Sequence, residues 1–490
     1  MKYALLGSGF FPETLPPCFS SQDCKRAFRG LSQILSDRRF YKKRNAPPVP
    51  YSGTKHDGSR RLYATPHVIP YYYICDFVGA NWKTFERQFA DSPFSISTPQ
   101  PAEDDTARAI IVTPLSEVST LAGRKVRHSP FILRADIAQF FPSIYTHTIA
   151  WAAHGKERCK KDRNPDSLAN RFNRLDFFVQ NAQSGQTRGV LIGPDAYRVI
   201  SEFVAVKIDQ ELFDRCDKLI IGAARHVDDF YIGVRSEADA MAALSHLRDS
   251  LAEYELNLND LKTTISPGIA PLDDPWAPRL RLLSDALTGD RSEERIISFL
   301  DEAIGISREL GTQSPIKLAV RRADRHALYL SPFYDCLEGY LQRMIYHFPH
   351  VIDYICLFVV KRVAIGAPID RDGWGDVVNA GILRHLVLGH HHETCWLFWL
   401  GIVCGFPIAG KVIDEIPKHN NYHLAALAIQ AFRDGKCERP RIRFGNKISS
   451  DDRSWLVNIV ARSADFTKAN FSGCYVDECG TSGGQTLAPY

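Results

Sequence analysis

Two adjacent carboxylates, Asp228 and Asp229, stand between the short apolar runs 219–221 and 230–232. This pattern predicts a β-hairpin that presents both side chains at its tip. Neighbouring anions repel each other, and a divalent cation relieves that repulsion. Nucleotidyl transfer uses carboxylates that hold two Mg²⁺ ions about 3.5–4 Å apart, so that the ions clamp the attacking and leaving oxygens. Taken alone, such a pair is more often a solvated turn.

A third carboxylate, Asp136, changes this interpretation. It stands at the carboxyl end of the apolar run 131–133, which predicts a buried strand. Pro142 then ends the extended run and opens a predicted helix. The structural alternative for Asp136 is the N-cap of a helix. If the strand end lies beside the hairpin tip, the three carboxylates together complete a metal site.

Four segments resemble the palm motifs of a reverse transcriptase and follow the order of that family. The segment around Asp136 resembles the first motif, and Val227 with the two carboxylates resembles the third. Residues 186–194 are similar to the glycine-rich second motif, and residues 256–263 resemble the fourth, including its lysine. The four motifs cover residues 130–265 at family-like spacing.

Other segments are similar to bacterial defence-associated reverse transcriptases, a group that includes the abortive-infection enzymes. The fingers of those enzymes are matched by residues 59–67, 81–82 and 108–110. Residues 143–147 and 151–156, which are not general to retroviral enzymes, match the same group, as do residues 392–399 in the carboxyl half.

The resemblance implies a metal site with two Mg²⁺ ions, or Mn²⁺ in their place. Asp136 and Asp228 would bind both ions with the backbone carbonyl of Ile137, and Asp229 would be the less direct carboxylate. The ions would lower the pKa of a primer hydroxyl and neutralise charge on the α-phosphate. Lys262 would protonate the leaving pyrophosphate or pair with it. The alternative for Lys262 is a solvated lysine at a helix end.

The resemblance also implies a deoxynucleotide site. Phe141, five residues beyond Asp136, would be an aromatic steric gate against a ribose 2′-hydroxyl, while Phe140 would belong to the core. Gly189 and Gly193 would let template and incoming nucleotide approach the backbone, where a Cβ would obstruct them. The alternative for both glycines is an ordinary turn.

Three arginines are candidates to hold the triphosphate, because guanidinium groups match phosphate oxygens. They are Arg60, Arg61 and Arg108, of which Arg108 is the strongest single candidate. Each of them could instead be a solvated surface residue.

Three residues depart from the family pattern. Leu191 replaces a usual proline, Tyr197 replaces a small hydroxyl residue, and His226 replaces the aromatic residue common before the third motif. No metal ligand is lost by these replacements. They favour an unusual product or mode of priming.

The positive charge of the chain is concentrated near its start. The 490 residues carry a net charge of +4, yet residues 1–61 hold 12 Lys/Arg against 4 Asp/Glu, a net +8, and the remainder sums to −4. Residues 38–44 intersperse cations with aromatics, which suits a nucleic-acid backbone and stacked bases. A second basic cluster lies within residues 156–174, for which we also expect contact with RNA or template.

Composition favours a cytoplasmic protein that does not enter the membrane, and the resemblance implies that it is bacterial. Hydrophobic residues make up 45% and charged residues 24%. The twelve cysteines include no CxxC pair, which argues for reduced thiols. The apolar run 395–410 is shorter than the ~20 residues that span a bilayer, and it is interpreted as a buried helix with its exit turn.

The expected fold class is α+β: the fingers and palm of a right-hand polymerase, with an antiparallel palm sheet and helices, followed by an all-α C-terminal domain. The predicted regions are a basic N-terminal arm (1–50), fingers and palm (51–270), a helical thumb-like region (271–345), and an α-helical C-terminal domain with a flexible tail (346–490).

The predicted function is RNA-directed DNA synthesis in bacterial antiphage defence, with a dedicated noncoding RNA as template or scaffold. The expected partners are RNA, the DNA product and deoxynucleoside triphosphates, and a homo-oligomer is left open. The alternative is a template-independent or protein-primed DNA polymerase of the abortive-infection type. A third hypothesis is an RNA-binding scaffold or toxin with a vestigial palm, and the presence of all three carboxylates argues against it.

Overall fold

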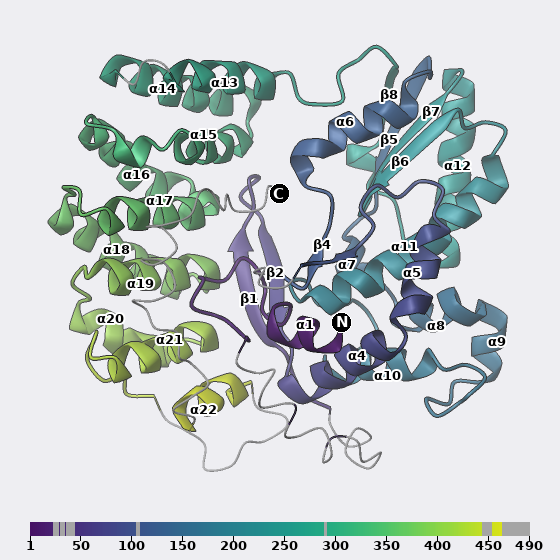
Figure 1. Ribbon diagram of the computed structural model, residues 1–490, viewed down its shortest axis with the longest axis horizontal. Coiled ribbons are helices and arrows are strands. Elements are labelled where there is room, and N and C mark those ends of the chain that lie inside the picture. Colours follow the sequence, from purple (N-terminus) through teal and green to yellow (C-terminus); the bar gives the residue numbers. More distant parts are fainter. Residues whose placement is uncertain are drawn as a thin grey trace.

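A four-stranded antiparallel sheet carries the three carboxylates (Figure 1). Its strands are β5 (Phe131–Asp136), β6 (Gly222–His226), β7 (Asp229–Val234) and β8 (Thr264–Pro267), in the order β6-β7-β5-β8. The computed structural model describes residues 1–22, 29, 35, 45–103, 108–288, 292–442 and 453–462. The hairpin and the buried strand predicted from the sequence are both present. The first hairpin strand is β6, which follows the apolar run 219–221 instead of containing it.

Both faces of the sheet are covered by helices. Residues that alternate along the strands enter two separate apolar cores, as the period of two in a strand requires. Leu133, Phe230 and Ile232 enter the main core, on the side of α11 (Asp195–Cys216) and α12 (Glu237–Glu253). On the other face, Ile132, Ala224 and Tyr231 pack with residues of α6 (Leu115–Val126). Near-continuous apolar strands are expected of a sheet that is buried on both faces.

The remaining elements before β8 are helices and two pairs of strands. The helices are α1 (Lys2–Gly7), α4 (Val68–Ala80), α5 (Trp82–Ala90), α7 (Phe140–Ser143), α8 (His147–His154), α9 (Lys156–Lys161) and α10 (Asn173–Asn181). The strands are β1 (Val49–Thr54) and β2 (Arg60–Thr65), which form a hairpin, and the short pair β3 (Gln100–Pro101) and β4 (Ile110–Ile111).

The first residues of the chain belong to the core, although the sequence analysis places them in a basic arm over residues 1–50. Leu5 and Leu6 on α1 are buried, and α1 packs against α4. Phe10 and Phe11 follow in the same core and form an edge-to-face pair. These apolar side chains outweigh the basic composition of the segment. The basic and aromatic run 38–44 lies outside the described residues.

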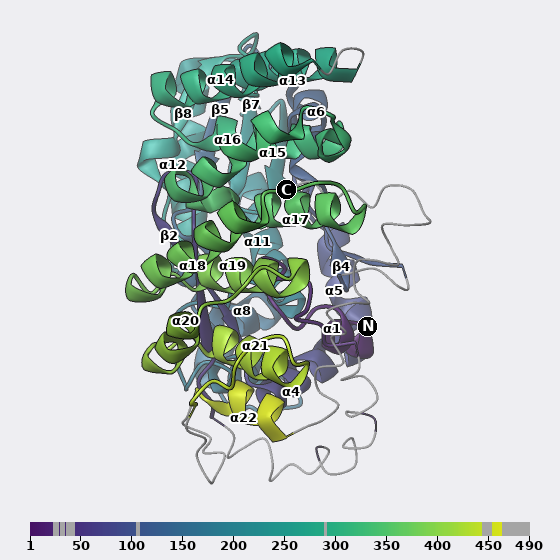
Figure 2. The ribbon, with the colours of Figure 1, turned by 90° about the vertical axis from the view of Figure 1, so that its left-hand side faces the viewer.

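Beyond β8, the described elements are all helices. Its α-helices are α13 (Trp276–Asp285), α14 (Glu293–Leu310), α15 (Ser314–Arg325), α16 (Tyr334–His347), α17 (Ile352–Ala364), α18 (Arg371–Val387), α19 (His391–Cys404), α20 (Gly410–Glu415), α21 (Tyr422–Arg433) and α22 (Trp455–Arg462). They descend in chain order as one column (Figures 1 and 2). The predicted class, α+β with an antiparallel sheet and helices followed by an all-α C-terminal region, is confirmed.

The helical column has two rows, because most of its helices contact the helix two positions further along the chain. α13, α15, α17, α19 and α21 form one row, and α14, α16, α18 and α20 form the other. The column continues through the predicted division at residue 345, which falls inside α16. The predicted flexible tail, residues 463–490, lies outside the described residues.

The β1–β2 hairpin joins the sheet-bearing half of the chain to the helical column (Figure 1). β1 contacts both α19 and α21. Arg60 pairs with Glu393 at 2.6 Å, and Tyr51 Oη lies 3.1 Å from Nδ1 of His392. Because Glu393 is fully buried, this ion pair fixes the hairpin on α19.

Among the described helices, none alone is long and apolar enough to cross a membrane. One pair, α16 with the segment 349–364, meets that test of length and composition only when joined across a bend of 119°.

Candidate active site

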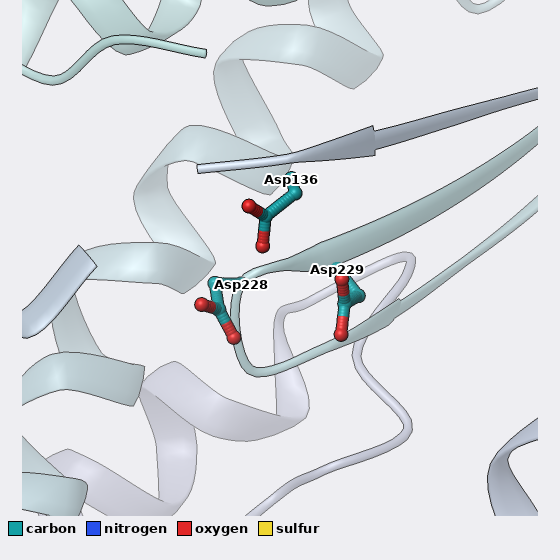
Figure 3. Close-up of side chains that lie close together, drawn as sticks. All are labelled: Asp136, Asp228 and Asp229. Carbon is teal, nitrogen blue, oxygen red and sulfur yellow. The ribbon is translucent and has the colours of Figure 1, made fainter. Parts of the chain in front are cut away.

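The three predicted carboxylates meet at one end of the central sheet (Figure 3). Asp136 is the last residue of β5, and its backbone is in register with Asp229, the first residue of β7. Asp228 occupies the turn between β6 and β7. One carboxylate oxygen from each residue lies within 4.8 Å of the other two. Two strands and one turn therefore bring together residues that are 92 positions apart in the sequence.

The hairpin differs in detail from the expected arrangement. His226 and Asp229 pair as the last and first residues of the two strands, so the turn consists of Val227 and Asp228. Asp228 alone lies at the tip, while Asp229 already belongs to a strand. The His226 Nε2 lies 3.0 Å from the carbonyl oxygen of Thr113, which fixes the ring beside the turn.

Crowding of the carboxylates makes the site suitable for a cation. Burial raises the pKa of Asp228 to about 7, and the charges of Asp229 and Asp136 add to this effect. Burial and the charge of Asp136 also raise the pKa of Asp229. Three oxygen donors on rigid backbone, with unfavourable mutual repulsion, match what Mg²⁺ and Mn²⁺ require. The residues present therefore fit the metal site that the sequence predicts.

Two residues of the segment 256–263 hold Asp136. Lys262 places its Nζ 3.2 Å from Oδ2 of Asp136. Asn259, which the sequence analysis missed, donates from Nδ2 to the same oxygen at 2.8 Å and from its backbone N–H to the Asp136 carbonyl at 2.7 Å. The position of Asn259 inside the fourth motif was the available signal. The side chain of Lys262 is 64% exposed, which leaves it free to reorient toward a ligand.

The backbone of Ile137 lies against the Val227–Asp228 turn. Its N–H donates to the carbonyl oxygen of Asp228 at 3.1 Å, which ties the end of β5 to the tip of the hairpin. The proposed metal-ligand role of the Ile137 carbonyl stays a prediction.

Phe141 lies in α7, close behind Asp136 in the chain. Phe140 is buried and Phe141 is half-buried, and their rings meet edge to face with centroids 5.5 Å apart. This difference in exposure agrees with the assignment of Phe140 to the core. The steric-gate role of Phe141 stays a prediction.

The two glycines serve contacts within the chain. Gly189 has φ of 86°, and a Cβ there would lie 3.0 Å from the carbonyl oxygen of Pro142. At Gly193, with φ of 128°, a Cβ would lie 2.6 Å from Cγ of Pro12. The close approach expected of template or nucleotide at Gly193 is thus made here by the N-terminal segment. Nucleotide binding at either glycine stays a prediction.

The three candidate arginines do not converge on one site. Arg60 is paired with Glu393 on α19. Arg108 forms an ion pair with Asp195 and donates to the carbonyl oxygens of Phe11 and Gly193, each at 3.0 Å. Arg61 is exposed. Arg60 and Arg108 would have to leave internal partners to bind a triphosphate, and neither is the solvated residue that the alternative envisaged.

Comparisons with known proteins find only distant structural likeness. No protein-family model matches the chain, and no curated protein matches it. A structure of apo telomerase from Candida tropicalis, truncated from the C-terminal domain, is similar at a TM-score of 0.29 and 12% identity. That likeness covers 51% of this chain and 56% of the other, so the chain spans little more than half the length of that protein.

Two further telomerase structures are similar over more of the chain. Telomerase from Candida albicans, in complex with a fragment of telomeric RNA, gives a TM-score of 0.32 at 10% identity, covering 78% of this chain and 71% of the other. Apo telomerase from Candida tropicalis gives 0.34 at 10% identity, covering 76% and 68%. The function of this chain is therefore inferred from its carboxylate site and not from these likenesses.

Proposed function

We propose that this chain is an RNA-directed DNA polymerase that works by two-metal-ion nucleotidyl transfer. The observation that carries the proposal is the meeting of Asp136, Asp228 and Asp229 at one end of an antiparallel sheet, with oxygens within 4.8 Å of one another. A strand end beside a hairpin tip is the arrangement that the motif order in the sequence predicts. Lys262, the lysine of the segment that resembles the fourth motif, lies beside Asp136 and supports the same proposal.

Each residue has a separate task in this proposal. Asp136 and Asp228 hold Mg²⁺ or Mn²⁺, with Asp229 and the Ile137 carbonyl in support. When bound, such ions lower the pKa of a primer hydroxyl and neutralise charge on the α-phosphate. Lys262, whose ammonium lies 3.2 Å from Asp136, would protonate the leaving pyrophosphate or pair with it.

Substrate selection is assigned to Phe141 and to an arginine. The half-exposed ring of Phe141 selects deoxynucleotides by excluding a ribose 2′-hydroxyl. Arg61 is the most accessible of the three candidate triphosphate ligands, because its side chain is exposed on β2. Arg60 and Arg108 could join it only by exchanging the partners described above.

We further propose that the enzyme acts in antiphage defence in the bacterial cytoplasm, with a dedicated noncoding RNA as template or scaffold. The resemblance of residues 59–67, 143–147 and 151–156 to defence-associated reverse transcriptases supports this context. Basic residues support an RNA partner: α9 carries four of them in six positions.

Template-independent or protein-primed DNA synthesis is the second candidate. A specific observation favours it: Pro12 fills the space at Gly193 where the family resemblance places template or nucleotide. The N-terminal segment is anchored there by Arg108, so a template would need another path or a displaced segment. The replacements at Leu191 and His226 point the same way.

Sequencing the nucleic acids that copurify with the protein separates the two candidates. The wild type should carry DNA complementary to one RNA, and Asp228→Ala should carry the RNA without that DNA. A homopolymer or random tract without a matching RNA would replace the first candidate with the second. DNA linked covalently to a Tyr, Ser or Thr would establish protein priming. Identical nucleic acids on both proteins would contradict polymerase activity altogether.

A further inference from the structure

A buried ionic cluster lies directly behind the catalytic turn. Arg225, on β6, is fully buried and lies three positions before Asp228. Its guanidinium donates to both carboxylate oxygens of Glu202, at 2.9 and 3.0 Å, and to both of Asp209, at 2.7 Å each. Both acids project from α11, a helix of the main core. Two carboxylates thus fix one guanidinium from two directions.

The fifth donor of the same guanidinium reaches the turn. Nη1 of Arg225 donates to the carbonyl oxygen of Val227 at 2.9 Å. A guanidinium has five N–H donors in a rigid plane, and here all five have partners. Burial alone would lower the pKa of Arg225, but Asp209 and Glu202 reverse the effect and raise it. The group is therefore a fixed cation whose only backbone acceptor is the turn residue before Asp228.

The other backbone group of Val227 is held by Ser97. Ser97 is buried, and its Oγ accepts from the Val227 N–H at 2.8 Å. Val227 has φ of 57°, in the left-handed region that β-branched residues rarely adopt. A conformation of this kind persists only where its surroundings enforce it. The two hydrogen bonds to Val227 provide that enforcement.

The loop that carries Ser97 is fixed to the same ionic cluster. Ser95 donates from its Oγ to Glu202 and Ser92 donates to Asp209, each at 2.6 Å. The backbone N–H of Arg225 donates to Phe94, and its carbonyl accepts from Ile96, each at 2.8 Å. The cluster thus controls both hydrogen-bond partners of Val227.

We propose that Arg225 and Ser97 are positioning residues that hold the Val227–Asp228 turn in its metal-binding conformation. The inference deepens the proposed function, on which it rests. The backbone of Asp228 accepts one hydrogen bond directly, from the Ile137 N–H at 3.1 Å, and the start of its turn is held through the two hydrogen bonds of Val227. If the turn relaxes, the Asp228 oxygens leave the set formed with Asp136 and Asp229, and metal affinity falls before the fold is lost.

Ser97→Ala tests the inference with the ionic cluster intact. It removes one acceptor of the turn and no charge. We expect the half-saturating Mg²⁺ concentration for DNA synthesis to rise about tenfold. Mn²⁺ affinity of the nucleic-acid-free protein, measured by titration calorimetry, should fall by a similar factor. Ser97→Thr, which keeps the hydroxyl, should restore most of both.

Arg225→Lys is the second variant, because it keeps the charge but has three donors for five acceptor positions. Like Ser97→Ala, it should raise the half-saturating Mg²⁺ concentration for DNA synthesis. Ser250→Ala is the matched control: Ser250 is equally buried, on α12, and donates to the His246 carbonyl within its own helix. Its Mg²⁺ and Mn²⁺ dependence should equal that of the wild type.

Different results would contradict the positioning role of Arg225 and Ser97 and the proposed polymerase function. Wild-type Mg²⁺ dependence and Mn²⁺ affinity in Ser97→Ala, or in folded Arg225→Lys, would overturn the positioning role. A polymerising wild type would leave the proposed function standing in that case. A wild type that binds Mn²⁺ but synthesises no DNA would overturn the proposed function, and the Mn²⁺ affinities of the variants would still decide the positioning role.

Discussion

At the scale of single residues, the site is a cluster of carboxylates that repel one another. The carboxylate oxygens of Asp136, Asp228 and Asp229 lie within 4.8 Å of one another, so the ionised side chains repel each other when no cation is bound. Burial strengthens this repulsion, because it removes the water that would screen the charges. Protein stability and metal binding should therefore oppose each other at these positions. This trade-off between stability and metal binding distinguishes a metal site from a solvated acidic turn. In a solvated turn, removal of one carboxylate changes the free energy of unfolding little.

Asp228→Asn should stabilise the metal-free protein at pH 8. The pKa of Asp228 is raised to about 7 in the folded chain, so its ionised form at pH 8 costs folding free energy that asparagine avoids. We expect a gain on the order of 1–2 kcal/mol. Thermal unfolding in EDTA and in Mg²⁺ measures this, and Mg²⁺ should stabilise the wild type but not the variant.

Asp260→Asn serves as its control, because Asp260 is an exposed carboxylate on the neighbouring segment. Its response to Mg²⁺ should match that of the wild type. Equal Mg²⁺ stabilisation of Asp228→Asn and the wild type would contradict the metal site.

Phe141→Ala should relax the choice of sugar. With the ring removed, a ribose 2′-hydroxyl meets no obstacle, and incorporation of ribonucleotides relative to deoxynucleotides should rise about tenfold or more. Competition between matched nucleotides in single-turnover reactions measures the ratio. Phe140→Leu, which changes the buried neighbour, should leave the ratio unchanged. A ratio unaffected by Phe141→Ala would show that this ring is not the steric gate.

At the scale of elements, a buried ion pair is one of the contacts that hold the β1–β2 hairpin on α19. Arg60→Gln should lower the free energy of unfolding by about 3 kcal/mol, because it leaves the fully buried Glu393 without its cation. Arg61→Gln, the exposed neighbour, should change it by less than about 0.5 kcal/mol. Urea unfolding measures both. If Arg60→Gln instead raised the KM for deoxynucleotides at unchanged stability, Arg60 would be a nucleotide ligand and not an interface residue.

Local patterns predicted the elements that carry the carboxylates. Alternating and continuous apolar runs around Asp136 and Asp228 identify strands because burial on a sheet has a period of two. The same reasoning could not find Arg225, whose partners Glu202 and Asp209 lie on a helix 23 and 16 positions away, respectively. A buried arginine and a solvated one look alike in sequence.

Contacts between residues that are distant in the sequence also explain the other differences between the predicted and the observed structure. Arg60 and Glu393 are separated by 333 positions, and no local pattern connects them. Leu5 and Phe10 resembled part of a basic arm because the count of charges in residues 1–61 masked a short apolar run. Only the fold reveals that α4 offers this run a surface.

At the scale of the whole molecule, buried neutral histidines lie at contacts between helices of the column and at its contact with the β1–β2 hairpin. His350 and His385 have pKa values lowered to about 4, and His423 to about 3, chiefly by burial. His423 lies on α21, and its Nε2 is 2.9 Å from the hydroxyl of Thr65 at the end of β2. Protonation of such groups is compatible with the unfolded chain but not with this packing.

The stability of the protein should therefore fall on mild acidification. A folded pKa below the unfolded value of about 6.5 means that the unfolded chain binds more protons between pH 6.5 and pH 4. Stability is then full above pH 6.5 and decreases as the pH falls through this window. Urea midpoints measured from pH 7.5 to pH 5 should show the decrease.

His423→Gln should make that decrease shallower, since glutamine can keep the bond to Thr65 without titrating. His128→Gln, at an exposed position, should leave the slope unchanged. A slope that is the same in wild type and His423→Gln would show that this histidine does not contribute to the pH dependence.

The central claim is that Asp136, Asp228 and Asp229 form the metal site of an RNA-directed DNA polymerase. Its most direct test is extension by the purified full chain, with labelled deoxynucleotides and copurifying or supplied RNA, in Mg²⁺ and in EDTA. We predict DNA synthesis that requires Mg²⁺ and is lost in Asp136→Asn and Asp228→Asn but kept in Asp260→Asn. Synthesis at the wild-type rate in folded Asp228→Asn would contradict the claim.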